Sequence, residues 1–148
     1  MDEPTFWGLI QQLDWTRSGK DERVVEPVVA ALAAMPVEEI HAFQGMLAQK
    51  LYALDGRRWA REAGPGIWWG EPDSLSVDSF LYARCVVVAN GRGFYELVLA
   101  NPEKMPKDME FESLLYVAQR AEERSVGHTV GIDTDVSFET FSNSEGWG

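Results

Sequence analysis

The sequence has little of several features that define whole classes of protein. One cysteine among 148 residues means that no disulfide can form within the chain, which fits a reducing compartment. No apolar run approaches the roughly 20 residues that a membrane-spanning helix needs. The first residues, Met1-Asp2-Glu3-Pro4, are acidic and lack the basic-then-apolar layout of a secretory signal. We therefore expect a soluble protein of the cytoplasm.

Basic residues are also scarce. The chain has 13 lysines and arginines against 24 aspartates and glutamates, a formal net charge of −11. Nucleic acids and anionic membranes bind basic surfaces, so we expect neither as a partner. The charge is compatible with a basic protein partner, and it is equally explained by solubility alone.

Chemistry-bearing residues are few. The two histidines, His41 and His128, have no metal ligand or nucleophile at a useful spacing, and we expect no metal and no cofactor. Cys85 lies inside an apolar run, where a small buried side chain is the favoured interpretation over a nucleophile. Catalysis is therefore the less favoured reading, and the sequence does not decide it.

What the chain does have is helical periodicity. With 45% apolar and 25% charged residues, it has the composition of one globular domain. We predict an all-α, compact single-domain bundle of about five or six helices, formed by residues 1–124. Residues 125–148 are predicted to be a polar C-terminal tail, partly packed or loose. A weak alternation at Val136, Phe138 and Phe141 suggests an arm along the body.

Apolar stripes and end signals place the helices. Pro27 is difficult for the second stripe, because proline belongs in the first turn of a helix. Either that helix starts near Glu26, or it is kinked or restarts at Pro27. Asp108 is predicted to cap the last helix, and Pro102 to Lys107 to form a loop. The predicted helices lie near residues 6–13, 24–32, 37–54, 76–90, 94–99 and 111–121.

The stretch from Ser76 to Gly91 is predicted to be a central buried helix, about 76–90. Ser76 suits the N-cap, Asn90-Gly91 suits a left-handed stop, and the residues between are apolar on nearly every side. One guanidinium, Arg84, projects from the apolar stripe. An unpaired charge there would be costly, so we predict that Arg84 is buried and paired with a carboxylate or with carbonyl groups of another element.

An aromatic loop precedes that helix. Residues 55–73 are predicted to be irregular, with Arg57, Arg58 and the adjacent Trp68 and Trp69 among glycines. Neighbouring residues of an extended segment point in opposite directions, so one tryptophan is expected to be exposed. The loop is either a lid on the core or a partner-binding surface, where tryptophan beside arginine is favoured.

The central helix and its flanks resemble a known family. Ser76-Val77-Asp78-Ser79-Phe80, Tyr82-Ala83-Arg84, Asn90-Gly91-Arg92, Tyr95 and Asn101-Pro102 resemble the pattern of the bacterial DUF4240 family, which has S-D-D-x-F, an arginine, a Q-G pair, a tyrosine and D-P. The resemblance runs from about Phe6 to Ala121. Val77 replaces the first acidic residue, which weakens the case for a paired-carboxylate site. The resemblance implies a helical fold and supplies no activity.

Two classes of function follow from these features. The favoured class is a non-enzymatic protein-interaction or regulatory module, with a basic partner or with binding through Trp68, Trp69, Arg57 and Arg58. The alternative is a small-anion-binding or catalytic pocket, with Arg84 at its wall and Asp78 beside it. Tyr82 and Tyr95 are the tyrosines that could complete that pocket.

Overall fold

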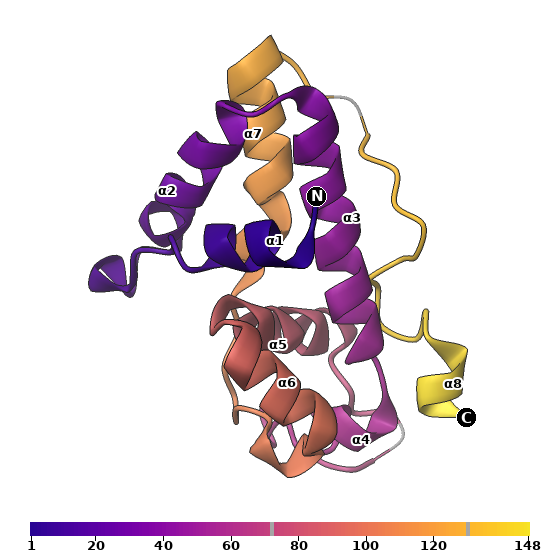
Figure 1. Cartoon of the computed structure of the whole chain (residues 1–148). Helices are drawn as coiled ribbons and strands as arrows, with labels where there is room; N and C mark the ends of the chain where they lie inside the picture. Colours follow the sequence, from indigo (N-terminus) through magenta and orange to yellow (C-terminus); the bar gives the residue numbers. More distant parts are fainter. Residues whose placement is uncertain (72, 130) are drawn as a thin grey trace.

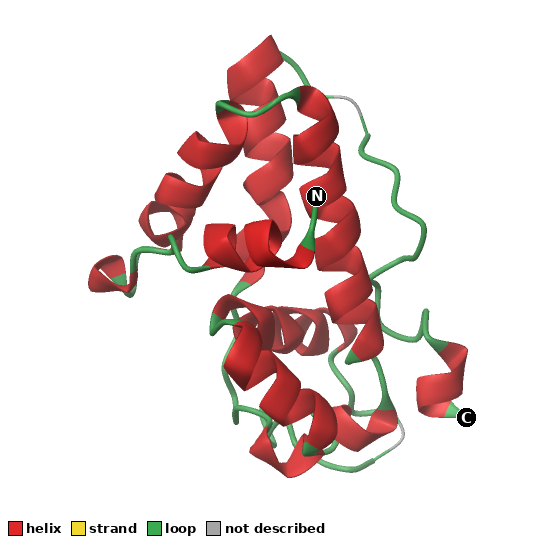
Figure 2. Cartoon of the chain, viewed as in Figure 1, coloured by secondary structure: helices red, strands yellow, loops and turns green. Residues whose placement is uncertain are grey.

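Every regular element of the described residues is helical. The computed structural model describes residues 1–71, 73–129 and 131–148, and these contain eight α-helices and three short 3₁₀ helices (Figure 2). The all-α prediction is confirmed. Two four-residue helices, α4 and α8, bring the number above the predicted five or six. The elements are α1 (Glu3–Ile10), η1 (Trp15–Arg17), α2 (Asp21–Ala33), α3 (Val37–Ala53), α4 (Arg57–Ala60), α5 (Val77–Ala89), α6 (Arg92–Ala100), η2 (Pro102–Lys104), η3 (Glu112–Tyr116), α7 (Val117–Val126) and α8 (Ser144–Trp147).

The long helices form two groups, one of α2, α3 and α7 and the other of α5 and α6, and one continuous core joins them. Helix α7 packs against both α2 and α3, and α5 packs against α3, α6 and η3 (Figure 1). The fully buried apolar residues extend from Phe6 in α1 to Ala121 in α7. The C-terminal segment returns from α7 along the outer side of α3, and its last helix, α8, contacts α4 (Figure 1).

Helix α5 is the predicted central helix. The Ser76 hydroxyl accepts a hydrogen bond from the Ser79 backbone N–H at 3.3 Å, and Gly91 has the left-handed φ of 97° predicted for the stop. Every residue from Phe80 to Ala89 except Tyr82 is buried. This confirms a helix packed on nearly all sides, at the junction of the two groups.

The structure excludes one of the two alternatives for the helix that contains Pro27. Helix α2 begins at Asp21 and includes Pro27, so a start near Glu26 is excluded. The proline cannot donate within the helix, and a carbonyl of the preceding turn, that of Val24, bonds outward to the Asp14 N–H at 2.9 Å. Pro102 begins a 3₁₀ turn, η2, within the predicted loop.

Asp108 does not cap the last helix. Its N–H donates to the Ala63 carbonyl at 2.8 Å, and its carboxylate accepts from the Gly66 N–H at 2.7 Å. Asp108 therefore pins the glycine-rich loop, with a left-handed φ of 53° of its own. The last helix starts later, through η3 into α7. The segment predicted to be irregular, residues 55–73, contains helix α4.

Residues 131–148 form an extended arm that ends in α8. From Gly131 to Thr140 exposed and half-buried residues alternate strictly, as expected of an extended segment with one face on the body. Of the alternation noted in the sequence, Val136 and Phe138 are on the half-buried face, whereas Phe141 is 52% exposed. The tail is partly packed on α3, α4 and α5. Its residues Ile132, Phe138 and Trp147 contact the core.

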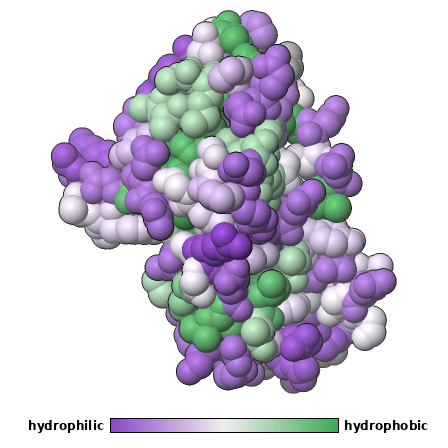
Figure 3. All heavy atoms as spheres, viewed as in Figure 1, coloured by the Kyte–Doolittle hydropathy of each residue, from purple (hydrophilic) through white to green (hydrophobic). Residues whose placement is uncertain are grey.

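The exposed face is mostly polar. Figure 3 shows hydrophilic residues over most of the view, with hydrophobic residues gathered over α2 and α6. Among the described residues, no helix is both long and apolar enough to cross a membrane.

Candidate functional site

Arg84 is fully buried and its guanidinium joins the body to the arm. One terminal nitrogen, Nη1, donates to the Leu51 carbonyl at 2.9 Å and to the Phe138 carbonyl at 3.0 Å. The other, Nη2, donates to the Thr140 hydroxyl at 3.0 Å, and the guanidinium lies 4.8 Å from the Phe80 ring centre. The prediction of a buried arginine paired with carbonyl groups is confirmed.

Burial changes the acidity of this group without neutralising it. Desolvation lowers the pKa of Arg84 to about 10, and the negative charge of Asp55 opposes the shift. Arg84 therefore remains a cation at neutral pH. A buried cation needs several acceptors around it, and the arm supplies two of the three that it has among the described residues.

Asp55 is the second buried charge, and every hydrogen bond that its carboxylate accepts in the described structure comes from the arm. The backbone N–H groups of Phe141 and Asn143 donate to its two oxygens at 3.2 and 2.9 Å. The Trp147 indole donates to it at 2.8 Å. The Asn143 amide adds a bond to the Tyr52 carbonyl at 3.1 Å. The arm is thus held through its main chain by one buried cation and one buried anion.

The end of the arm fits the body closely. A β-carbon at Gly146 would overlap the Asp55 carbonyl oxygen, so no larger residue fits there without movement. The Trp147 ring lies edge-on to Phe80 and Phe141, with ring centres 5.9 and 4.7 Å away. Phe141 has a left-handed φ of 78°, which a free chain rarely adopts. The body imposes this conformation on the arm.

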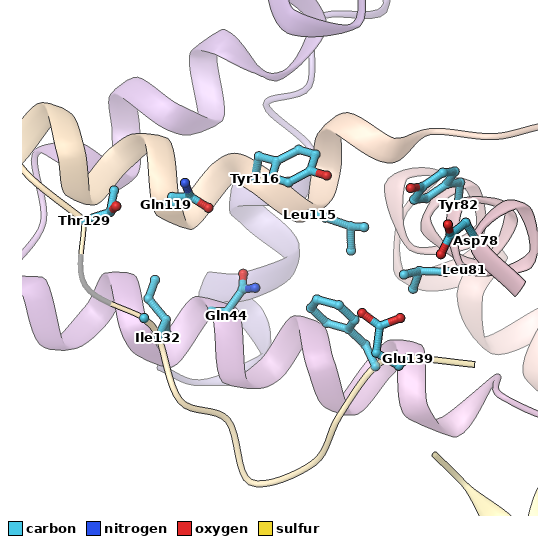
Figure 4. Close-up of a pocket in the computed structure, with 12 residues that line it drawn as sticks. Gln44, Asp78, Leu81, Tyr82, Leu115, Tyr116, Gln119, Thr129, Ile132 and Glu139 are labelled. Carbon is cyan, nitrogen blue, oxygen red and sulfur yellow. The ribbon is translucent and has the colours of Figure 1, made fainter. Parts of the chain in front are cut away.

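A cavity of about 490 Å³ lies between the body and the arm (Figure 4). Helix α3 supplies Gln44, and the arm supplies the residues of the outer wall. In Figure 4 the carboxylates of Asp78 and Glu139 approach from the α5 side and the arm side, and the hydroxyl groups of Tyr82 and Tyr116 point toward one another. The remaining lining residues are Leu81, Leu115, Gln119, Thr129, Gly131, Ile132 and Phe138.

The potential in this cavity is negative. No lysine, arginine or histidine belongs to the described lining. Burial and then the charges of Glu112, Asp78 and Glu139 raise the pKa of Tyr82. A hydrogen bond from the Tyr116 hydroxyl to Glu112, at 2.8 Å, is the main cause that raises the pKa of Tyr116 to about 12. Both tyrosines therefore stay protonated at neutral pH.

The four residues predicted for an anion pocket do not come together. Asp78 and Tyr82 line the cavity, whereas Arg84 is not among its lining residues. Tyr95 lies elsewhere, donating to the Lys50 carbonyl at 3.0 Å, and burial raises its pKa. The prediction that Arg84 would stand at a pocket wall thus has no support from this cavity, because the arm covers the guanidinium.

The residues predicted for partner binding do not form one surface: two of them contact the arm and two do not. Trp68 packs against the arm, its ring centre 6.4 Å from that of Trp147, and Arg57 donates to the Trp147 carbonyl at 3.1 Å. Arg58 lies over the Trp59 ring at 5.1 Å. Trp69 is 67% exposed, as expected for one of the two adjacent tryptophans.

Sequence reasoning missed Asp55, Glu139 and Tyr116. Asp55 follows a long amphipathic helix, where a solvated loop residue is the ordinary expectation, and nothing local signals its distant partners.

Cys85 is buried as predicted, and burial raises its pKa to about 12, which keeps it a thiol. The apolar residues on both sides of Cys85 were sufficient to predict its burial. His41, whose side chain is 37% exposed, contacts the buried Glu122. No group of three or more His, Cys, Asp or Glu with metal-binding geometry occurs in the described residues.

Together the fold and the site define a small all-α domain that holds an extended segment of its own chain with two buried charges. The chain belongs to the DUF4240 family, whose description is a protein of unknown function, and the match covers residues 1–124. It includes Asp55 and Arg84 and ends before the arm. No curated protein and no solved structure matches the chain.

Proposed function

We propose that this protein is a non-enzymatic interaction module that binds a basic protein partner by taking a lysine or arginine side chain into the cavity under the arm. The observation that carries the proposal is the lining of that cavity. Two carboxylates, Asp78 and Glu139, stand on different walls, and no described lysine, arginine or histidine is among the lining residues.

The aromatic groups support the same ligand. Tyr82 and Tyr116 line the cavity, and tyrosine rings attract ammonium and guanidinium groups through their π faces. The side-chain oxygen of Gln44, another lining residue, is buried and has no hydrogen-bond partner in the described structure. A ligand that brings N–H donors could bond to the Gln44 oxygen and to the two carboxylates, whereas an anion would be repelled by Asp78 and Glu139.

Size and charge fit this role. The cavity, about 490 Å³, falls in the roughly 300–1,000 Å³ range of ligand pockets and exceeds the needs of one lysine side chain. The net charge of −11 would steer a basic partner toward the surface and speed association at low salt. Catalysis has less support, because the described cavity lining has no histidine and no cysteine.

Binding of charged hexapeptides tests the proposal. We expect capped hexalysine and hexaarginine to bind the full chain in calorimetry, and capped hexaglutamine not to bind. Asp78→Asn together with Glu139→Gln should weaken binding at least about tenfold, the loss of two close charge pairs. The control removes two exposed carboxylates away from the cavity, Glu22→Gln with Glu103→Gln, and should weaken binding about twofold or less. Equal losses in the two double variants would refute a specific cavity site.

A further inference from the structure

We propose that the groove beneath the arm is a peptide-docking site, and that it accepts the arm of a second copy of this chain in place of its own. The groove consists of Asp55, Arg84 and the backbone around them, and its present occupant is residues 138–147 of the same chain. This inference goes beyond recognition of a basic side chain and does not depend on it.

The first support is that the body supplies the charged side chains of the contact and the arm supplies mainly main-chain groups. Asp55 and Arg84 both belong to the part that matches the family, residues 1–124, and the arm lies outside that part. Their bonds go mainly to main-chain atoms, the Phe138 carbonyl and the N–H groups of Phe141 and Asn143. Recognition of an extended main chain is what peptide-docking sites do. The body is therefore a receptor and the arm a ligand joined to it by a covalent linker.

The second support is the fit that selects this occupant. The close approach of Gly146 to the Asp55 carbonyl, the Thr140 hydroxyl on Arg84 and the Trp147 indole on Asp55 each demand one residue type at one position. An unrelated peptide would have to meet all three demands. A second copy carries the same arm and meets them without any new contact, as in arm exchange between protomers.

The linker permits the exchange. Helix α7 ends at Val126, followed by the left-handed Gly127, and the described residues from Glu123 to Gly131 are all exposed. A short linker gives the arm an effective concentration in about the millimolar range for its own groove. The wild-type chain should therefore be monomeric at about 10 µM, and exchange should grow as concentration approaches about 1 mM. In an exchanged pair each cavity would take its outer wall from the other copy.

Complementation between two defective full-length chains tests the exchange. One chain has a damaged arm and an intact groove, Thr140→Ala with Gly146→Ala. The other has a damaged groove and an intact arm, Asp55→Asn. Neither has a competent pair within itself, so no intramolecular docking competes. We expect each alone to remain at 16.6 kDa in light scattering and a one-to-one mixture to shift toward twice that mass.

A control chain carries two similar substitutions at arm positions that do not contact Asp55 or Arg84. Ser137→Ala with Gly131→Ala likewise removes one hydroxyl and adds one β-carbon in the same arm: the Ser137 hydroxyl accepts only from the Glu139 N–H within the arm, and a β-carbon at residue 131 would meet nothing within 4 Å. Mixed with Asp55→Asn, this chain keeps its own arm docked and should give no dimer. A mixture of the two defective chains that stays monomeric, with both chains helical by circular dichroism, overturns the proposal.

A peptide measurement decides the question if Asp55→Asn does not fold. A fluorescent peptide of residues 132–148 should bind the damaged-arm chain and should bind the wild type at least about tenfold more weakly, because the tethered arm competes at millimolar effective concentration. Equal binding to the two chains, or binding to neither, overturns the proposal.

Discussion

The body and the arm of this protein are held by different forces. In the body, buried apolar side chains from Phe6 to Ala121 form one continuous core, which tolerates small changes by repacking. In the arm, no described residue is buried, and much of the attachment consists of hydrogen bonds, above all to Arg84 and Asp55, together with one aromatic cluster. Directional contacts of this kind fail one at a time. The arm should therefore respond to single substitutions that the body would absorb.

The largest effect should come from Arg84, which belongs to both regions. Arg84→Met leaves the Leu51 and Phe138 carbonyls without their donor and Asp55 without its nearby cation. We expect a loss of about 3–5 kcal/mol in the free energy of unfolding, measured by urea denaturation, as for other broken buried ionic groups. The control Arg120→Met removes a half-exposed partner of Glu26 and should cost about 1 kcal/mol or less. A loss at Arg84 as small as the control would show that the buried cation contributes little.

Asp55→Asn should loosen the arm and leave the body folded. The amide keeps the shape but presents an N–H group toward donors of the arm, so at least one bond to Phe141, Asn143 or Trp147 is lost. We expect about 1–3 kcal/mol less stability and faster hydrogen exchange at the Phe141 and Asn143 amides. Amides in the middle of α5 should keep their protection. Equal acceleration in α5 would mean that arm and body unfold as one unit.

Trp147→Phe should have a smaller effect, because the ring stays and only one bond is lost. The substitution removes the indole N–H that donates to Asp55 at 2.8 Å and preserves most of the contact with Phe80 and Phe141. We expect a loss of about 1 kcal/mol, read from thermal denaturation. Trp69→Phe is the matched control, since Trp69 is 67% exposed, and should change stability by less than about 0.5 kcal/mol.

The smallest effect concerns a surface ion pair within the body. Arg124, bonded to Glu26 at 2.6 Å, is the main cause that lowers the pKa of Glu26. A lowered pKa in the folded state stabilises the protein above the unfolded value, near 4.5, and this contribution is lost as pH falls through the folded value. Glu26→Gln should cost about 0.5 kcal/mol at pH 7 and nothing well below pH 4, because the pair is half exposed. The same cost at both pH values would contradict an ionic origin.

The sequence predicted the body far better than the arm, for a physical reason. Helix α5, with its serine cap and its buried arginine, follows from periodicity and from the cost of an unpaired charge, both of which are local. The partners of Asp55 lie 86 or more positions away, and no local pattern encodes such contacts. Asp108 shows the same limit, because its loop contact outweighed the local preference for a helix cap. Two of the twelve described residues that line the cavity, Asp78 and Tyr82, were foreseeable, since they share a helix that the sequence identifies.

The order of synthesis gives the buried pair a further consequence. A ribosome adds about 5–20 residues per second, whereas helices form in about a microsecond. Asp55 and Arg84 therefore emerge well before residues 138–147 exist, and for some seconds water must occupy the place of the arm. Until residues 138–147 are made, the groove of the nascent chain lacks its own arm and would be open to the arm of another copy. The time between making the groove and making the arm is when a second copy would compete best.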